Sequence, residues 1–96
     1  MGKIPKDLQG LFWSRKLDSL DLLKDKSYIV NQILAYGSLE QIKWLFRTYS
    51  EKEIKETFFS QPRKVYTPQS FNFVKNYILD LESRKVPAGP YVKIIF

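Results

Sequence analysis

The sequence predicts an all-α fold, an orthogonal bundle of about four main helices with a helix-turn-helix-like centre and a short C-terminal arm. Apolar residues recur at helical spacing from residue 25 onwards, and three successive stretches open on Ser or Thr in a helix-capping pattern. No internal repeat or linker divides the 96 residues. We therefore expect one domain over 1–96, with an N-terminal docking segment over 1–24 and a C-terminal arm over 87–96.

The N-terminal segment begins with an apolar cluster. Leu8, Leu11, Phe12 and Trp13 follow Pro5, which predicts a short helical turn that docks onto the body of the domain. Residues 17–23 continue as an irregular apolar stretch, and we expect a packed loop or a short helix there.

Three aspartates, Asp18, Asp21 and Asp25, lie in and beside this stretch. Carboxylates at such spacing can converge on magnesium. No glycine-turned loop and no further ligand accompanies them, so helix caps and solvated surface are the favoured interpretation.

The first regular helix is predicted from Asp25 onwards. Ile29, Ile33 and Tyr36 recur at helical spacing, and the pattern stops at Gly37. Glycine is typical of the position that follows a helix C-terminus, so we expect this helix to end there.

The second helix is expected to start at Ser38, because Ser38 and Gln41 have the form of a capping box. Its residues divide into two faces. The apolar face holds Leu39, Ile42, Leu45, Phe46 and Tyr49, and the polar face holds Glu40, Lys43 and Arg47.

Ser50 with Glu53 repeats the capping form after a tight turn. This pattern predicts a third helix over about 51–60, with Ile54 and Phe58 facing inward. Pro62 then ends the helix.

Thr67 followed by Pro68 predicts the start of a fourth helix, which should extend to about Glu82. Phe71, Val74, Ile78 and Leu81 make its predicted buried stripe, with Phe73 and Tyr77 widening it. Residues 86–90 contain two prolines and a glycine that break regular structure, and residues 91–96 are expected to form a short strand or a docked tail.

The composition excludes most catalytic chemistry. The chain has no cysteine and no histidine, so it lacks thiolate nucleophiles, sulfur-ligated zinc and the side chain that titrates nearest neutrality. We expect neither an enzyme nor a bound cofactor or metal; the remaining catalytic alternative is a carboxylate pair such as Glu53 and Glu56 with raised pKa values. No secretory signal and no bilayer-length apolar run is visible, so a cytoplasmic setting without a membrane partner is expected.

The net charge of +6 is unevenly distributed. Residues 1–60 hold ten basic and eight acidic side chains, whereas residues 61–96 hold six basic and two acidic ones. The C-terminal third therefore favours an anionic partner, either nucleic acid or an acidic protein. The alternative is that the charge serves solubility alone.

Several blocks of the sequence resemble one family. They are Leu11-Phe12-Trp13, Leu20-Asp21, Asp25-Lys26, Ala35-Tyr36-Gly37-Ser38, Ile42-Lys43-Trp44-Leu45-Phe46-Arg47-Thr48-Tyr49-Ser50 and Glu53-Ile54. They resemble short prokaryotic proteins that tend to be encoded next to a nucleotidyltransferase-type toxin of the AbiEii class. The resemblance covers roughly residues 5–81, departs from the family between 58 and 67, and implies an antitoxin-like role with the toxin as protein partner. It brings no catalytic residues.

The two helices joined by the tight turn at residues 48–50 have the outline of a helix-turn-helix. Glu51, Glu53 and Glu56 on the second of them would face phosphates unfavourably. The start of the fourth helix suits nucleic acid better, both by its side chains and by the helix dipole. The predicted nucleic-acid-binding residues are Arg63, Lys64, Gln69, Ser70, Asn72, Lys75 and Asn76. The alternative is a helical hairpin that does not contact DNA.

Aromatic residues suggest further contacts. Trp44 lies on the flank of the second helix beside Lys43 and Arg47, which favours a partner-binding role; the alternative is a Trp44 packed beneath the N-terminal segment near Trp13. In the C-terminal arm, Tyr91, Ile94 and Phe96 would contact a partner unless the tail folds back over its own helices. The tyrosines could stack on bases, but amphipathic packing against the helices is the favoured interpretation. These tyrosines are Tyr28, Tyr36, Tyr49, Tyr66 and Tyr77.

Together these observations predict an antitoxin-like binding protein that pairs with a nucleotidyltransferase-type toxin and represses its own operon by binding operator DNA. One alternative is a stand-alone helix-turn-helix DNA-binding regulator. The other is a protein interaction module that does not bind DNA.

Overall fold

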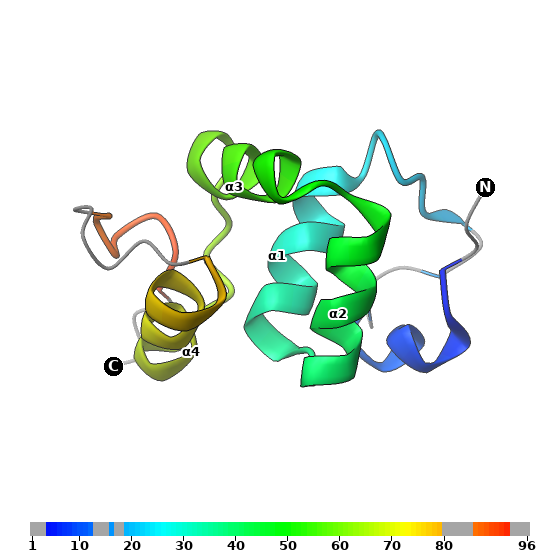
Figure 1. Cartoon of the computed structure of the whole chain (residues 1–96), viewed down its shortest axis with the longest axis horizontal. Coiled ribbons are helices and arrows are strands. Elements are labelled where there is room, and N and C mark those ends of the chain that lie inside the picture. Colours follow the sequence, from blue (N-terminus) through cyan, green and yellow to red (C-terminus); the bar gives the residue numbers. More distant parts are fainter. Residues whose placement is uncertain (1–3, 13–15, 17–18, 80–85, 93–96) are drawn as a thin grey trace.

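The computed structural model describes residues 4–12, 16, 19–79 and 86–92 (Figure 1). The helices follow in the order η1 (Lys6–Gly10), α1 (Lys26–Tyr36), α2 (Leu39–Thr48), α3 (Glu51–Ser60), α4 (Pro68–Phe73) and η3 (Val74–Ile78). η1 is a 3-10 helix, and η3 is a π-helical turn that continues α4. Within these ranges the β-type pairing is one isolated parallel bridge, between Tyr66 and Val92, and no helix has the length and apolarity to cross a membrane. The predicted all-α fold with four main helices is confirmed.

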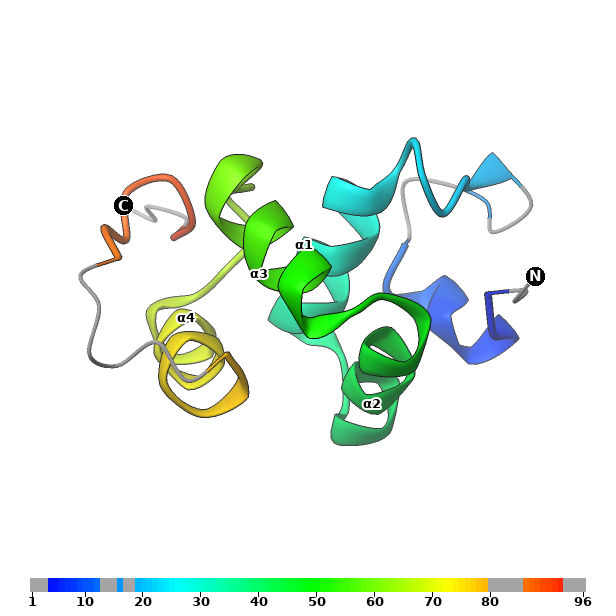
Figure 2. The ribbon, with the colours of Figure 1, turned by 45° about the horizontal axis from the view of Figure 1, so that its top comes forward.

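The central helix of the bundle is α1, which packs against α2, α3 and α4. Figure 1 shows α1 and α2 side by side, α3 running across the top, α4 at the lower left and η1 at the lower right. Figure 2 shows from a second direction that α4 and η1 lie on opposite sides of α1. The fourth helix and the N-terminal segment therefore form two separate edges of the molecule.

One hydrophobic core joins the N-terminal segment to the four helices. Leu8 and Phe12 are fully buried in it, as predicted for a docking segment, and Trp13 lies outside the described residues. The helices contribute Ile29, Val30, Ile33, Leu34, Ile42, Leu45, Ile54, Phe58, Phe71 and Val74. Because burying each such side chain stabilises by about 1.5–3 kcal/mol, the docking segment is an integral part of the fold.

Both predicted capping boxes are present. Ser38 Oγ accepts the Gln41 N–H at 3.2 Å while Gln41 Oε1 accepts the Ser38 N–H at 2.8 Å. Ser50 Oγ accepts the Glu53 N–H at 3.1 Å while Glu53 Oε1 accepts the Ser50 N–H at 2.9 Å. These boxes start α2 and α3 at the predicted residues, because each satisfies two backbone amides that the helix leaves unpaired.

Gly37 ends α1 for a steric reason. Its backbone is extended, with φ −74° and ψ 154°, a conformation that any residue adopts. A Cβ atom at this position would lie 2.6 Å from the backbone oxygen of Ile33. The glycine therefore allows α2 to begin immediately after α1 by close approach and not by a left-handed conformation.

A buried polar group on α1 ties three parts of the chain together. Asn31 is fully buried; its Nδ2 donates to the backbone oxygens of Ser27 (2.9 Å) and Gln61 (3.2 Å), and its Oδ1 accepts the Tyr66 hydroxyl at 2.8 Å. The end of α3 and the connector that follows it, residues 61–67, are thereby fixed against α1. Every polar atom of this buried amide has a partner, as a stable core requires.

Three apolar residues predicted to be buried are exposed instead. Leu39 is 61% exposed, Phe73 42% and Tyr77 76%. Leu39 is the first residue of α2, so its side chain projects beyond the contact between α1 and α2. Phe73 and Tyr77 are exposed on the fourth helix, whereas Phe71 and Val74 on the same helix are buried. The predicted extension of this helix to about residue 82 is described as far as η3, and residues 80–85 lie outside the described ranges.

Candidate functional site

The predicted partner-binding residues of α2 lie on its outer flank. Lys43 and Arg47 are exposed, and Lys43 Nζ lies 3.4 Å from Glu40 Oε1. Trp44 is half-buried and packs in part against the core. The Trp44 side chain is therefore partly packed and partly accessible, and its partner-binding role stays a prediction; Trp13, named in the alternative, lies outside the described residues.

A small pocket adjoins Trp44 between η1 and α2. Its volume is about 200 Å³, and its lining residues are Pro5, Asp7, Leu8, Glu40, Gln41, Trp44 and Arg47. Gln41 Nε2 donates to Asp7 Oδ2 at 3.3 Å, and Gln32 Nε2 donates to the backbone oxygen of Leu11 at 2.7 Å. These bonds hold the N-terminal segment in place, so the pocket is preformed. Tryptophan and arginine beside a concavity are typical anchors of protein interfaces.

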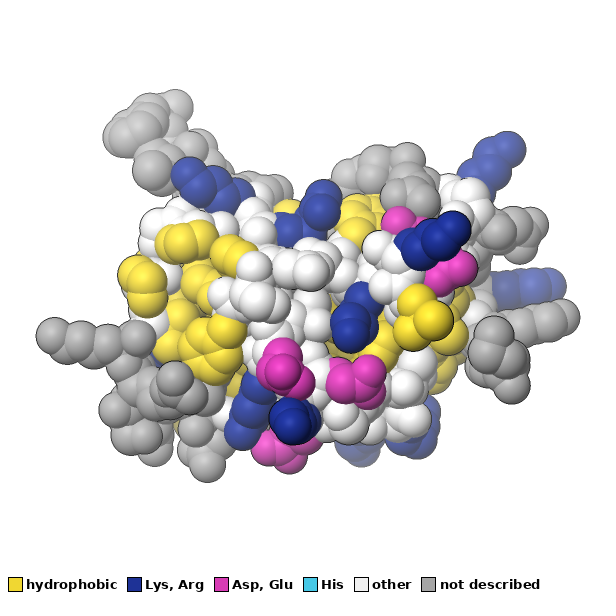
Figure 3. Space-filling view, turned by 90° about the horizontal axis from the view of Figure 1, so that it is seen from above, with side chains coloured by type: hydrophobic (Ala, Val, Ile, Leu, Met, Phe, Trp, Pro, Cys, Tyr) yellow, Lys and Arg dark blue, Asp and Glu magenta, His cyan; other side chains and the backbone are white. Residues whose placement is uncertain are grey.

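A second hollow lies on the outer side of α3. It has a volume of about 550 Å³, and the described residues that line it are Glu51, Lys52, Lys55, Glu56, Phe59 and Ser60. Figure 3, a view from above, shows acidic and basic side chains close together in the middle of this face and hydrophobic ones gathered at its left. Lys55 Nζ lies 2.9 Å from Glu51 Oε2, so local charges largely cancel. This near-neutral surface suits nucleic acid poorly, as the sequence predicts for α3.

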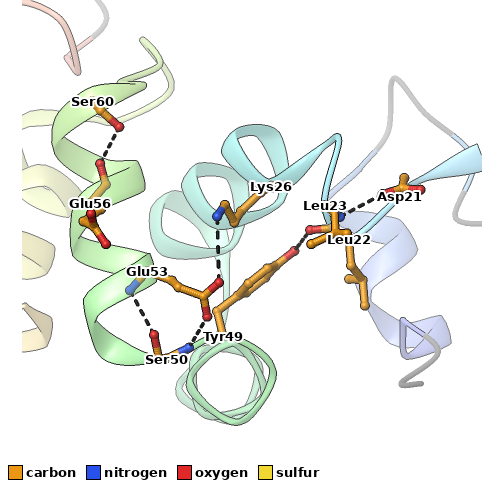
Figure 4. Close-up of polar contacts among 9 residues, drawn as sticks. All are labelled: Asp21, Leu22, Leu23, Lys26, Tyr49, Ser50, Glu53, Glu56 and Ser60. Atoms are coloured by element: carbon orange, nitrogen blue, oxygen red, sulfur yellow. Dashed lines mark hydrogen bonds and ion pairs between the residues drawn. The ribbon is translucent and has the colours of Figure 1, made fainter.

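The turn between α2 and α3 is held by a polar cluster (Figure 4). Glu53 accepts from Ser50 and lies 3.9 Å from Lys26 Nζ. Hydrogen bonds from Ser50, and to a smaller extent the charge of Lys26, hold the pKa of the Glu53 carboxyl below its ordinary value. The catalytic alternative requires a raised pKa at Glu53, whereas the hydrogen bonds at the turn lower it.

Tyr49 completes this cluster. Its hydroxyl donates to the backbone oxygen of Leu22 at 2.6 Å, which fastens the end of α2 to the N-terminal segment. Burial, and then the negative charges of Glu53, Asp21 and Asp25, raise the pKa of Tyr49 to about 12. The hydroxyl therefore stays a neutral donor.

The aspartates of the N-terminal segment cap backbone amides. Asp21 Oδ1 accepts the N–H groups of Leu23 and Lys24 at 2.8 and 2.9 Å, and Asp25 Oδ2 accepts the Asp21 N–H at 2.8 Å. The bonds from Lys24 and Leu23 lower the pKa of Asp21. Asp18 lies outside the described residues, and within them no three acidic side chains gather into a cluster that could hold a metal ion.

Four of the predicted nucleic-acid-binding residues are accessible. Arg63 and Lys64 are exposed on the connector, and Gln69 and Asn72 are exposed on α4. The guanidinium carbon of Arg63 lies 5.3 Å from the centroid of the Tyr28 ring, a cation–π arrangement that orients it. The connector and the first turns of α4 thus present cations and amides on the surface.

Ser70 is used differently from what the sequence predicts. Its Oγ accepts the Thr67 N–H at 2.9 Å, and its own N–H donates to Thr67 Oγ1 at 3.1 Å, so its hydroxyl belongs to the helix cap. Pro68 has no N–H, and the amides of Thr67 and Ser70 are used in the capping box. The amino end of this helix therefore has fewer free backbone N–H donors for an anion than the sequence predicts.

Lys75 and Asn76, the remaining two predicted residues, are half-buried in η3. The Oδ1 atom of Asn76 is buried and accepts no hydrogen bond from the described part of the chain. An unpaired buried acceptor is uncommon in folded proteins.

The first part of the C-terminal arm folds back over the helices. Tyr91 is 3% exposed, its ring stacks on Phe58 with centroids 4.5 Å apart, and its hydroxyl donates to the Phe58 backbone oxygen at 2.6 Å. The Tyr66 N–H donates to the Tyr91 backbone oxygen at 3.0 Å. The prediction that Tyr91 contacts a partner is therefore wrong for this structure, because the aromatic cluster holds the side chain inside. Ile94 and Phe96 lie outside the described residues.

Phe73 and Tyr77 form an exposed pair that the sequence pattern does not predict. Their ring centroids are 5.9 Å apart, with an interplanar angle of 34°. Tyr49 and Tyr66, by contrast, are buried, so the tyrosines do not share one role. The four-residue spacing of Phe73 and Tyr77 predicts that the two rings are neighbours on the helix, but not that the pair is exposed.

Comparison with known proteins matches residues 8–58, more than half of the chain, to a family of unknown function, DUF6922. The match extends from the docking segment to Phe58 on α3. It therefore includes the α2 flank, which consists of Lys43, Trp44 and Arg47. No curated protein and no solved structure matches the chain significantly.

Proposed function

We propose that this chain, which belongs to the DUF6922 family, is an antitoxin-like binding protein that pairs with a nucleotidyltransferase-type toxin in the cytoplasm. The observation that carries the proposal is the α2 flank, where half-buried Trp44 and exposed Arg47 border a preformed pocket. The class of partner comes from the resemblance of residues 5–81 to proteins encoded beside AbiEii-class toxins. Any chemistry in such a pair belongs to the toxin.

The position of this flank in the family match supports the proposal. Trp44, Arg47 and the pocket wall at Leu8 all lie within the matched residues 8–58, whereas α4 and the C-terminal arm lie beyond them. A pairing function common to the family would use a surface that the family shares. Partly packed aromatic side chains are effective anchors, because little conformational freedom is lost when a partner covers them.

Co-expression with the neighbouring gene tests the proposal. We expect a nucleotidyltransferase gene beside the gene of this chain, co-purification of the two products, and relief of the toxin's growth inhibition by the chain. Absence of such a neighbour, or failure of the two proteins to associate, would remove the proposal.

A second candidate function, binding of operator DNA, is favoured by the charge of the connector and the fourth helix. Residues 61–79 contain Arg63, Lys64 and Lys75 and no acidic residue, and the next acidic residue is Asp80. Arg63 and Lys64 are exposed. Such a segment suits phosphate contacts, each of which releases counterions when DNA binds.

The salt dependence of DNA affinity tests this candidate. Replacing Arg63 and Lys64 together with alanine should weaken binding to DNA from the promoter of the chain's own operon and reduce the slope of log affinity against log salt by about two. An unchanged slope would exclude these two residues as phosphate contacts. Toxin binding without any DNA binding would instead indicate a protein interaction module alone.

A further inference from the structure

We propose that the outer face of α4 and η3 binds single-stranded nucleic acid by stacking unpaired bases on Phe73 and Tyr77. This inference rests on the part of the second candidate function that assigns the basic segment and the fourth helix to nucleic acid, and it assigns the two exposed rings to single strands.

The face combines two ring platforms with amide side chains. Phe73 and Tyr77 are 42% and 76% exposed, although both are large apolar rings that a helix normally buries. They stand four residues apart and touch one another, with ring centroids 5.9 Å apart. Gln69 and Asn72 are exposed on the preceding turns of the same helix. Aromatic rings stack on the faces of bases, and side-chain amides form hydrogen bonds with their edges.

The charge of the segment is complementary to a phosphate backbone. Arg63 and Lys64, which precede the helix, are exposed. Lys75 is half-buried and, at two residues from each ring, projects from another side of the helix. No acidic residue stands between Gln61 and Leu79 in the sequence to oppose a phosphate. Single-strand binding surfaces combine stacking rings with cations.

The geometry favours unpaired bases over a duplex. In a duplex the base faces are covered by their neighbours, so an exposed ring gains little there beyond contact with a thymine methyl group. The 5.9 Å between the rings also exceeds the step of about 3.4 Å between stacked bases of one DNA strand. Each ring can therefore take its own base from an extended strand.

Two unusual features occur in the same turn. The backbone from Val74 to Ile78 is π-helical, with the Leu79 N–H donating to the Val74 oxygen at 2.8 Å. π-helical turns are rare and occur frequently at functional sites. Asn76, beside Tyr77, carries the buried acceptor that has no partner in the described ranges. Such departures from regular helix are more common at binding surfaces than in purely structural helices.

Fluorescence anisotropy with a labelled oligouridine, a labelled oligothymidine and a labelled duplex of matched length from the promoter of the chain's own operon tests the inference. We expect the full chain to bind the single strands more tightly than the duplex. Phe73→Ala and Tyr77→Ala should each weaken single-strand binding about tenfold, whereas Tyr77→Phe, which keeps the ring, should bind within about twofold of the unmodified chain. Leu23→Ala, at another exposed apolar position, should leave binding unchanged.

Because both rings are exposed, the variants should keep the melting temperature of the unmodified chain, and circular dichroism checks this. Tight duplex binding that Phe73→Ala and Tyr77→Ala leave unaltered would overturn the inference while the second candidate function stands. Absence of binding to all three nucleic acids would overturn both. Loss of toxin association in these variants without single-strand binding would assign the face to a protein partner and equally overturn the inference.

Discussion

Asn31 shows how a single residue can fix several parts of a small fold. Its side chain is fully buried and bonds to Ser27, Gln61 and Tyr66, so α1, the end of α3 and the connector meet at one amide. Burial raises the pKa of the Tyr66 hydroxyl, which therefore remains a neutral donor to this amide. A mid-helix Asn with apolar neighbours indicates such a network from sequence, but its distant partners cannot be predicted because they depend on tertiary packing.

Replacing Asn31 with alanine should lower the free energy of unfolding by about 2–3 kcal/mol, because the Tyr66 hydroxyl loses its buried acceptor. Tyr66→Phe should cost about 1–2 kcal/mol, and the double variant less than the sum of the two, because both remove the same bond. Urea denaturation measures all three. Additive effects would contradict the coupling, and Asn72→Ala, at an exposed position, serves as the control.

The Glu53 carboxylate gives the fold a pH dependence of known sign. Its pKa is lowered in the folded chain from an ordinary value of 4.5, so its contribution to stability is present above about pH 4.5 and is lost as the pH falls through the folded-state pKa. Glu53→Gln should therefore lose less stability than the unmodified chain on acidification below pH 4.5. Thermal melts across this range, with Glu56→Gln as a charge-matched control on the same helix, measure the difference. Parallel curves for the unmodified chain and Glu53→Gln would contradict the assignment.

At the scale of the elements, local chemistry predicts the helix starts, whereas packing decides which faces are buried. The starts of α2, α3 and α4 follow from Ser38, Ser50 and Thr67, since each cap lies within three residues of its partners. The exposure of Phe73 and Tyr77 could not be predicted in the same way. A helix pattern with apolar residues on most sides does not say which side meets the bundle, and contact with α1 settles this for α4.

The short connection between α1 and α2 depends on Gly37. Gly37→Ala should destabilise the fold by about 1–3 kcal/mol, because the added Cβ would lie 2.6 Å from the Ile33 backbone oxygen. Gly10→Ala is the matched control, since a Cβ there would meet nothing within 4 Å, and it should change stability by less than about 0.5 kcal/mol. Equal denaturation midpoints for Gly37→Ala and Gly10→Ala would show that the close approach of residue 37 to the Ile33 oxygen is not the reason for glycine at this position.

At the scale of the whole molecule, the fold separates two surfaces. The pocket beside Trp44 lies between η1 and α2, and the basic, amide-bearing start of α4 lies at the opposite edge (Figure 1). The sequence predicts the residue types on both surfaces, Lys43, Trp44 and Arg47 on one and Arg63 and Lys64 on the other. It does not predict the pocket, which depends on docking of the N-terminal segment through Gln41 and Gln32. The two surfaces therefore do not overlap.

The affinity of the purified chain for the proposed nucleotidyltransferase partner, measured by titration calorimetry for Trp44→Ala and Arg47→Ala, tests the proposed pairing most directly. We expect each change to weaken binding at least about tenfold while far-ultraviolet circular dichroism still reports a folded helical chain, because truncation of an interface anchor commonly costs about 2 kcal/mol or more. Lys52→Ala, on the outer side of α3, should bind as the unmodified chain does. Unchanged affinity in both folded variants would contradict the assignment of the α2 flank as the toxin-binding surface.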